Sequence, residues 1–184
     1  MKIRIFALLS LIAGSLSLAS CIDDEATNDV ILANDKAAIN AYIDTTSIVN
    51  LKELHDEVTG LRMIWQEVAP SDTIETFFLG DTITVNYTGK FLSDKVFETT
   101  LESVAKANGI YKENGKYEPV EFLLGGVILG FQYGISNMEI GEKATVFVPS
   151  EFAYGRDGNR NIGPNTPLIF ELELVQVNPV KREQ

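Results

Sequence analysis

The chain has 184 residues, of which 45% are hydrophobic, with a formal net charge of −11 and one cysteine. This length is sufficient for one domain with a substantial core and for extensions beside it. The acidic balance makes nucleic acid and anionic lipid surfaces poor partners. A single cysteine excludes a disulfide within the chain.

The first 20 residues have the composition of a secretory signal peptide. Lys2 and Arg4 form a positive region without acids, and residues 5–19 are apolar or small. This run is shorter than the about 20 apolar residues that a membrane-spanning helix needs. We therefore predict a signal peptide at residues 1–20. Its removal leaves 13 basic and 26 acidic residues, a net charge of −13.

Cys21 follows the apolar run directly, in the tetrad Leu18-Ala19-Ser20-Cys21. This tetrad resembles a bacterial lipobox, in which the cysteine is acylated and becomes the first residue of the mature protein; a chance free thiol is the alternative. Several acyl chains anchor a protein stably to a bilayer, whereas one does so only marginally. We predict a lipid-anchored protein of the cell envelope, in the outer membrane and either periplasmic or surface-exposed. The acids at 23–25 fit a solvated tether or a surface-export signal.

Residues 21–60 are predicted to form a lipidated tether with a short helical extension. Residues 22–35 are polar and acidic, which favours a flexible stalk. Residues 34–43 place Ile39 and Ile43 four apart behind an Asn or Asp cap, which predicts one short amphipathic helix. That helix could pack on the domain, form a weak homodimer contact or fray.

Residues 51–58 offer a second helical stretch, although the signals around it are mixed. The compact domain is predicted at 61–178, followed by a tail at 179–184. Its clearest element is 82–88, where apolar and polar residues alternate as in a half-buried strand.

Further strands are predicted from the same alternation, and one helix from apolar residues three and four apart. A hydrophilic excursion interrupts them, and short strands with one helix indicate an α+β domain, either a half-barrel or a sheet on a helix. The strands are expected at residues 61–68, 96–98, 120–124, 144–148 and 168–175, the helix within 127–138 and the excursion at 101–118.

The chain lacks the residues of most catalytic centres. His55, which we expect at the surface, is the only histidine, so the chain has almost no residues from which to build a histidine-dependent catalytic triad. One histidine and one cysteine are too few for a zinc site of the Cys/His type. Neither phosphate-binding glycine motif occurs. An EF-hand loop starting at Asp157 would have Ile162 and Leu168 where glycine and glutamate are required. We predict no metal and no cofactor. Two of the many aromatic residues, Phe122 and Phe147, are expected in the core.

Four blocks in order resemble the FKBP-type peptidyl-prolyl isomerases, and the match extends from about residue 61 to 177. Residues 80–89 end in the YTG of a family strand, and residues 96–100 (VFETT) are similar to its VFDSS. Residues 122–143 carry FLLGGVILGF and MEIGEK. The last block, 148–174, contains VPSEFAYG, IGPN and LIFELEL. One block alone is weak, whereas four in this order are specific.

The resemblance implies a strongly curved antiparallel sheet wrapped on one short helix, with an apolar proline-binding cleft between them. In the family, the backbone N–H at the position of Ile128 and the hydroxyl at the position of Tyr154 donate hydrogen bonds to substrate carbonyl oxygens. The acid at the position of Glu98 supports the polar side of the cleft. Phe131 would form the floor. The implied catalytic residues are Tyr87, Phe97, Glu98, Ile128, Phe131, Tyr154 and Phe170, with Val120, Val127 and Ile162 binding substrate.

Three positions depart from the family pattern. Phe131 stands where tryptophan is usual, Glu98 replaces aspartate, and Val120 replaces an aromatic wall in many members. The segment 97–119 is also longer than in minimal members, so it could cover the cleft or add a partner surface. The resemblance implies an isomerase acting on proline-containing exported or surface polypeptides. The alternative is a non-catalytic binding module or chaperone on the same fold.

Overall fold

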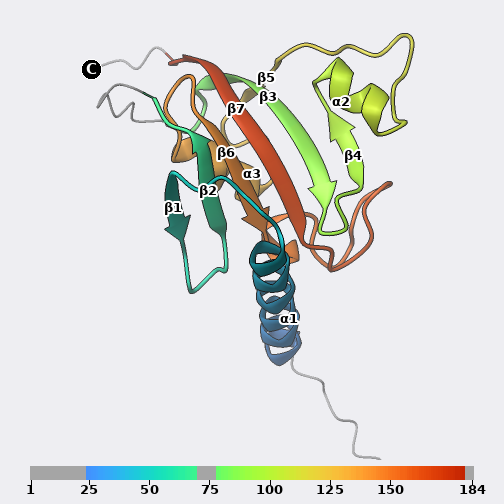
Figure 1. Cartoon of the computed structure of the whole chain (residues 1–184). Helices are drawn as coiled ribbons and strands as arrows, with labels where there is room; N and C mark the ends of the chain where they lie inside the picture. Colours follow the sequence, from blue (N-terminus) through green and yellow to red (C-terminus); the bar gives the residue numbers. More distant parts are fainter. Residues whose placement is uncertain (1–23, 70–77, 181–184) are drawn as a thin grey trace, which may run out of the picture.

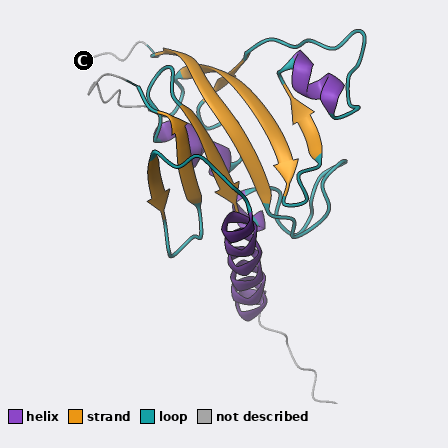
Figure 2. Ribbon diagram, viewed as in Figure 1, coloured by secondary structure: helices purple, strands orange, loops and turns teal. Residues whose placement is uncertain are grey.

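The computed structural model describes residues 24–69 and 78–180. The predicted signal peptide, Cys21 and most of the predicted tail lie outside these residues. Figure 1 gives the element labels, and Figure 2 shows how strands dominate the fold. The elements are α1 (Asp24–Thr45), β1 (Lys52–His55), β2 (Arg62–Glu67), β3 (Thr82–Phe91), β4 (Val96–Thr99), α2 (Glu102–Ala107), β5 (Val120–Leu123), α3 (Leu129–Ser136), β6 (Lys143–Val148), the 3-10 turn η1 (Ser150–Phe152) and β7 (Leu168–Asn178).

Seven strands form one open, curved, antiparallel sheet in the order β1-β2-β6-β7-β3-β4, with β5 also paired to β3. β3 is long enough to serve two partners on one edge. Its first half pairs with β5 and its second half with β4, while β7 runs along its other edge. This arrangement confirms the predicted α+β fold, a curved sheet around one short helix.

The main core fills the face of the sheet that holds α3, here called the inner face. Alternation along each strand directs every second side chain there. On β6 these are Ala144, Val146 and Val148, all buried, and they meet Phe131 and Ile135 of α3. The strand predicted at 144–148 is therefore present, and it is buried on both faces, because Thr145 and Phe147 on the other face are buried as well.

A second, smaller core lies on the opposite, outer face of the sheet. Ile64, Phe147 and Ile169 point there from β2, β6 and β7, and Ile39 of α1 covers them with 1% of its own surface exposed. Phe147 is fully buried, as predicted, but it belongs to this outer cluster. Helices α1 and α3 therefore pack on opposite faces of one sheet (Figure 1).

The prediction of a flexible stalk at 22–35 is wrong for the described part, because α1 begins at Asp24 and extends for 22 residues. Contacts with the rest of the domain stabilise the helix in spite of the polar composition of this segment. The Asp35 carboxyl group is buried and accepts hydrogen bonds from the Ser150 N–H and hydroxyl at 2.8 and 2.6 Å. Asn28 accepts a bond from Arg156 at 2.9 Å. No helix within the described residues is both long and apolar enough to cross a membrane.

Residues 51–58 form a strand and a turn, so the second predicted helix is also wrong. β1 pairs with β2 along its whole length. In the turn between them, the Asp56 carboxylate accepts hydrogen bonds from the N–H groups of Val58 and Thr59. Gly60 closes the turn with a φ of +73°, which glycine adopts without strain. β1 belongs to the same sheet as the strands after residue 61. The predicted domain boundary at residue 61 stays a prediction.

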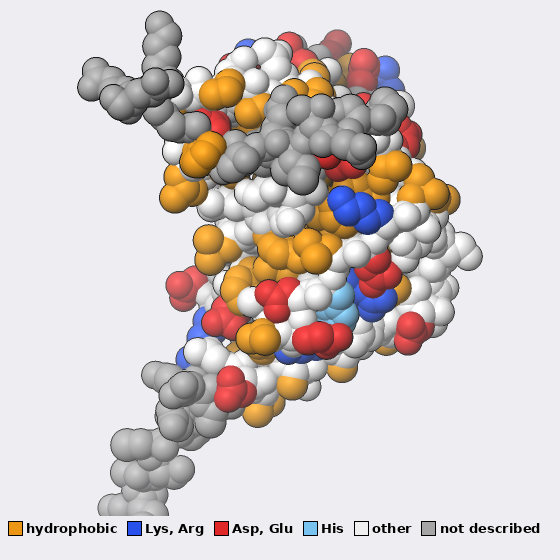
Figure 3. Space-filling model, turned by 90° about the vertical axis from the view of Figure 1, so that its left-hand side faces the viewer, with side chains coloured by type: hydrophobic (Ala, Val, Ile, Leu, Met, Phe, Trp, Pro, Cys, Tyr) orange, Lys and Arg blue, Asp and Glu red, His pale blue; other side chains and the backbone are white. Residues whose placement is uncertain are grey.

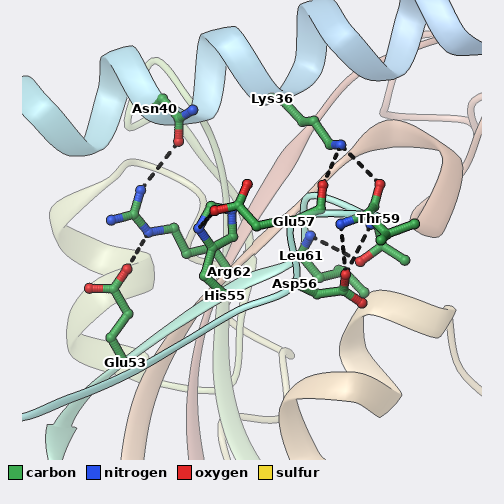
Figure 4. Close-up of polar contacts among 10 residues, drawn as sticks. Lys36, Asn40, Glu53, His55, Asp56, Glu57, Thr59, Leu61 and Arg62 are labelled. Atoms are coloured by element: carbon green, nitrogen blue, oxygen red, sulfur yellow. Dashed lines mark hydrogen bonds and ion pairs between the residues drawn. The ribbon is translucent and has the colours of Figure 1, made fainter.

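α1 and the β1–β2 hairpin are joined by polar contacts, which Figure 4 shows in detail. Lys36 donates to the backbone oxygens of Glu57 and Val58 at 2.7 and 2.9 Å. Arg62 donates to Asn40 on the helix, and it also pairs with Glu53 on β1. The extension is thus attached at three places: the outer core, this hairpin and the loop after β6.

We predict that Asp35→Ala lowers the free energy of unfolding by about 1–3 kcal/mol, because Ser150 would keep a buried N–H and hydroxyl without their acceptor. Urea unfolding of the mature protein measures this change. Asp29→Ala is the matched control, since Asp29 is exposed on the same helix and its loss should change stability by less than about 0.5 kcal/mol. Equal effects of the two substitutions would contradict the anchoring role.

Candidate functional site

A cleft of about 530 Å³ lies between the inner face of the sheet and the N-terminal end of α3. This volume is within the range of about 300–1,000 Å³ typical of ligand sites. Most of its walls are aromatic or aliphatic, and the polar groups gather at one side. The lining residues are Tyr87, Glu98, Val120, Phe122, Gly126, Val127, Ile128, Phe131, Tyr154 and Phe170.

Phe131 forms the floor of this cleft. It projects from α3, retains 5% of its surface exposed, and is met edge-on by three other rings. The ring centroids of Tyr87, Phe122 and Phe170 lie 5.6, 5.2 and 5.4 Å away, at interplanar angles of 90, 70 and 80°. Edge-to-face contacts of this kind hold the rings in fixed orientations. The floor is therefore a rigid aromatic surface.

Two glycines allow α3 to approach the sheet closely enough to place Phe131 there. A Cβ atom on Gly130 would lie 2.2 Å from Cγ1 and 3.0 Å from Cβ of Val148. One on Gly134 would lie 2.7 Å from Val146. Real Cβ atoms do not approach other atoms so closely, so any larger residue would move the helix away from β6. Gly130, in the FLLGGVILGF block, and Gly134, just after it, thus have a packing role.

The polar side of the cleft is formed by Glu98, Tyr87 and Tyr154. Burial raises the pKa of the Tyr87 hydroxyl, and the negative charge of Glu98, together with a hydrogen bond to it, raises this pKa further. Burial also raises the pKa of Tyr154, with a second contribution from Glu98, while Asn159 acts in the opposite direction. Both hydroxyl groups consequently stay protonated at neutral pH and can donate hydrogen bonds.

Ile128 lies at the start of α3 with an extended backbone, at φ −57° and ψ 148°. Its carbonyl oxygen accepts the first bonds of the helix from Phe131 and Gln132. Its N–H, in contrast, has no acceptor among the described residues. Because Ile128 also lines the cleft, this donor is available to a bound molecule.

Eight of the ten residues predicted for the site line this one cleft, and whether they bind substrate stays a prediction. Phe97 and Ile162 lie outside it. Phe97 packs between Phe91 and Phe170 at 5.2 and 6.0 Å, and a Cβ on Gly89 would meet its ring at 2.4 Å. Ile162 is buried, and both residues line a neighbouring cavity instead.

Phe122 and Gly126 also line the cleft, although the sequence pattern did not predict them there. Phe122 was expected in the core, but it is only partly buried and forms a wall of the cleft beside Phe131. Phe122 lies on β5, opposite Ile83 of β3, and β5 pairs with no other described strand. Alternation alone cannot show this, because it identifies the face of a strand and not what covers that face.

Two other surface features, a charged hollow and the exposed His55, lie outside this cleft. A hollow of about 710 Å³ on the outer face has charged walls, including the ion pairs of Lys90 with Glu171 and of Lys143 with Glu173. His55 is exposed, as predicted, with its Nδ1 atom 3.2 Å from a Glu57 oxygen. Figure 3 shows it as a small pale-blue area among acidic and basic side chains.

Comparison with known proteins gives a consistent family. Residues 75–175 match the profile described as FKBP-type peptidyl-prolyl cis-trans isomerase. FK506-binding protein 2 of Yarrowia lipolytica is 34% identical over 118 residues, which cover 62% of this chain and 73% of that protein. FkpA of Escherichia coli K12 is 34% identical over 102 residues, 55% of this chain and 33% of FkpA. This chain therefore spans about a third of the length of that relative.

Solved structures give the same result for the fold. The crystal structure of FkpA from Escherichia coli superposes with a TM-score of 0.59 at 27% identity, covering 85% of this chain and 65% of that chain. A peptidyl-prolyl cis-trans isomerase from Pseudomonas syringae superposes with a TM-score of 0.57 at 25% identity, covering 83% and 96%.

We predict that Gly130→Ala destabilises the protein by about 1–3 kcal/mol, although helix propensity alone favours alanine over glycine by about 1 kcal/mol. The added methyl group would overlap Val148. Urea unfolding measures the difference. Ser136→Ala, at the exposed end of the same helix, controls for propensity and should leave stability unchanged or slightly raised. A more stable Gly130→Ala protein would show that α3 is not held at this distance.

Proposed function

The chain belongs to the FKBP-type peptidyl-prolyl cis-trans isomerase family, and on that premise we propose that it accelerates rotation about X-Pro peptide bonds. The observation that carries the proposal is the rigid aromatic floor: Phe131 lies at the base of a cleft whose other walls are mostly apolar. The substrates are proline-containing polypeptides.

Rotation about a peptide bond needs no nucleophile, because no bond is made or broken. Amide resonance opposes it with a barrier of about 18–20 kcal/mol, so X-Pro bonds interconvert over about 10–100 s unaided. Resonance places negative charge on the carbonyl oxygen of the planar amide, and the twisted transition state carries less of it. An apolar cleft therefore disfavours the planar form relative to the twisted one, and this difference is what lowers the barrier.

The required stabilisation is modest. A thousand-fold acceleration corresponds to about 4 kcal/mol, since each tenfold change in rate is 1.36 kcal/mol. The proline ring would lie on Phe131, with Tyr87 and Phe170 beside it. The N–H of Ile128 and the hydroxyl of Tyr154 would donate to substrate carbonyl groups and fix the chain on either side of the rotating bond. Phe131 gives a smaller floor than the tryptophan that is usual in the family.

We predict that the protein accelerates cis-to-trans conversion of a proline tetrapeptide in a protease-coupled assay. Phe131→Ala should lower kcat/KM at least about tenfold, and Tyr154→Phe by a smaller factor, because one removes the floor and the other a single donor. Tyr42→Phe is the matched control. It deletes a hydroxyl that bonds Asp94 on the outer face at 2.6 Å, so activity should persist.

Since a large-to-small substitution in a packed site also costs stability, the Phe131→Ala protein is assayed only where its unfolding stays cooperative. No acceleration by the unaltered protein would reject the enzymatic function. Binding of the peptide without acceleration would instead favour the non-catalytic binding module.

We further propose that the protein is exported and anchored in the cell envelope through an acylated Cys21. The support is the charged and apolar composition of residues 1–20 and the tetrad that ends in Cys21. Helix α1 begins only three residues later and spans about 33 Å at 1.5 Å per residue. It would form an ordered link between the lipid and the sheet. Its outward-facing residues Val30, Ala33, Ala37 and Ala41 are the surface through which a weak homodimer would form.

We predict that Cys21→Ser releases the protein from membranes of a Gram-negative host and abolishes its labelling by radioactive palmitate. The thiol is the only one in the chain, so no other cysteine can be acylated. Cys21→Ser remaining in the membrane fraction, or an unlabelled parent protein, would contradict the anchor. Sedimentation of residues 22–184 at increasing concentration tests dimerisation, and a constant mass of one chain would exclude it.

A further inference from the structure

A second cavity, of about 790 Å³, adjoins the proline cleft. It lies between the excursion that follows β4 and the loop that follows Tyr154. Glu98 and Tyr154 line both cavities, so these two residues form the boundary between them. A chain bound in the cleft and leaving it at this side would enter the second cavity directly.

The excursion at 101–118 is an ordered structure. Its helix α2 is fixed by Ala105, which is completely buried, and Ile110 donates a backbone bond to the Ala105 oxygen at 3.0 Å. Beyond α2 the rings of Tyr111 and Tyr117 stack at 5.4 Å with an interplanar angle of 15°. The Tyr117 hydroxyl accepts the N–H of Lys112 at 2.8 Å. The cavity walls are therefore held before any ligand arrives, which lowers the entropy cost of binding.

The charge of this cavity is opposite to that of the protein. Three lysines line it, Lys95, Lys112 and Lys116, against one acid, Glu98, whereas the whole chain carries −11. None of the three lysines has an ion-pair partner among the described residues. Three other described lysines do have such partners: Lys90 and Lys143 on the sheet, and Lys106 with Glu102 on α2. Unpaired positive charges concentrated in a concave site attract anions.

We propose that this cavity, the lysine subsite, binds the client polypeptide next to its proline and favours acidic side chains there. The inference rests on the proposed function, because it assigns a substrate preference to the same cleft. An extended chain advances about 3.3–3.6 Å per residue, so two or three residues beside the proline reach the subsite. Carboxylates would pair with Lys112 and Lys116, while Tyr111 and Tyr117 offer aromatic surface to the chain.

The expected preference is moderate, because the lysines are exposed. One exposed charge pair changes an equilibrium constant by about 1.5- to 5-fold, so two independent pairs should raise kcat/KM by about 2- to 25-fold. Raising the ionic strength to 1 M should remove most of that gain, since the Debye length falls to about 3 Å.

The test uses three peptides with the same central Ala-Pro pair: one neutral, one with three glutamates before the pair and one with three after it. Exchange between their cis and trans forms is followed by NMR, without a protease, and their binding by fluorescence anisotropy. We expect one glutamate peptide to exceed the neutral peptide in both measurements. The double substitution of Lys112→Gln and Lys116→Gln should abolish this gain and leave the neutral peptide unaffected.

Lys52→Gln is the matched control for the loss of positive charge, because β1 lies at the opposite edge of the sheet from β4. It should retain the preference. Equal turnover and equal binding of all three peptides would overturn the lysine subsite while leaving the isomerase function intact. If no peptide is turned over, the isomerase function fails, and the subsite is then decided by binding: it stands only if a glutamate peptide binds more tightly than the neutral one.

Discussion

The close contact between α3 and β6 is the constraint on which the rest of the site depends. Gly130 and Gly134 remove the two side chains that would separate the helix from Val148 and Val146. At this distance Phe131 reaches the other three rings of the floor. At the start of the helix, the N–H of the cleft residue Ile128 has no acceptor among the described residues. A helix displaced by a methyl group would disturb the floor and the donor together. Packing and function therefore share the same atoms.

The second, smaller core lies on the outer face of the sheet. Alternation sends Phe147 and Ile169 there, and α1 covers them. The same helix holds the segment that leads from β6 to Tyr154, since Asp35 binds Ser150 and Asn28 binds Arg156. The N-terminal extension, which precedes the residues matched by the family profile, is thus attached next to a cleft residue. If Cys21 is acylated as proposed, this helix would lie between the lipid and the sheet.

The sequence predicted the sheet well because its strands show clear alternation, as in Ile83, Val85 and Tyr87. It also predicted α3 and brought eight cleft residues together through family motifs. The failures have physical causes. α1 is stabilised by partners such as Ser150 that are more than a hundred residues away in the sequence, and local composition cannot reveal them. β1 is a strand because β2 lies beside it. Phe122 looks like a core residue by its alternation, and only the shape of the sheet edge exposes it.

In the proposed mechanism, an aromatic cleft accelerates X-Pro rotation by disfavouring the planar amide, and two donors hold the chain. The most direct measurement records, in one NMR sample, the exchange of a neutral proline peptide at substoichiometric protein and the amide shifts of the protein itself. If this mechanism operates, the cis and trans peptides should exchange within seconds, with the largest shifts at Ile128, Phe131 and Tyr154. Shifts centred on the outer face, or shifts in the cleft without faster exchange, would contradict it.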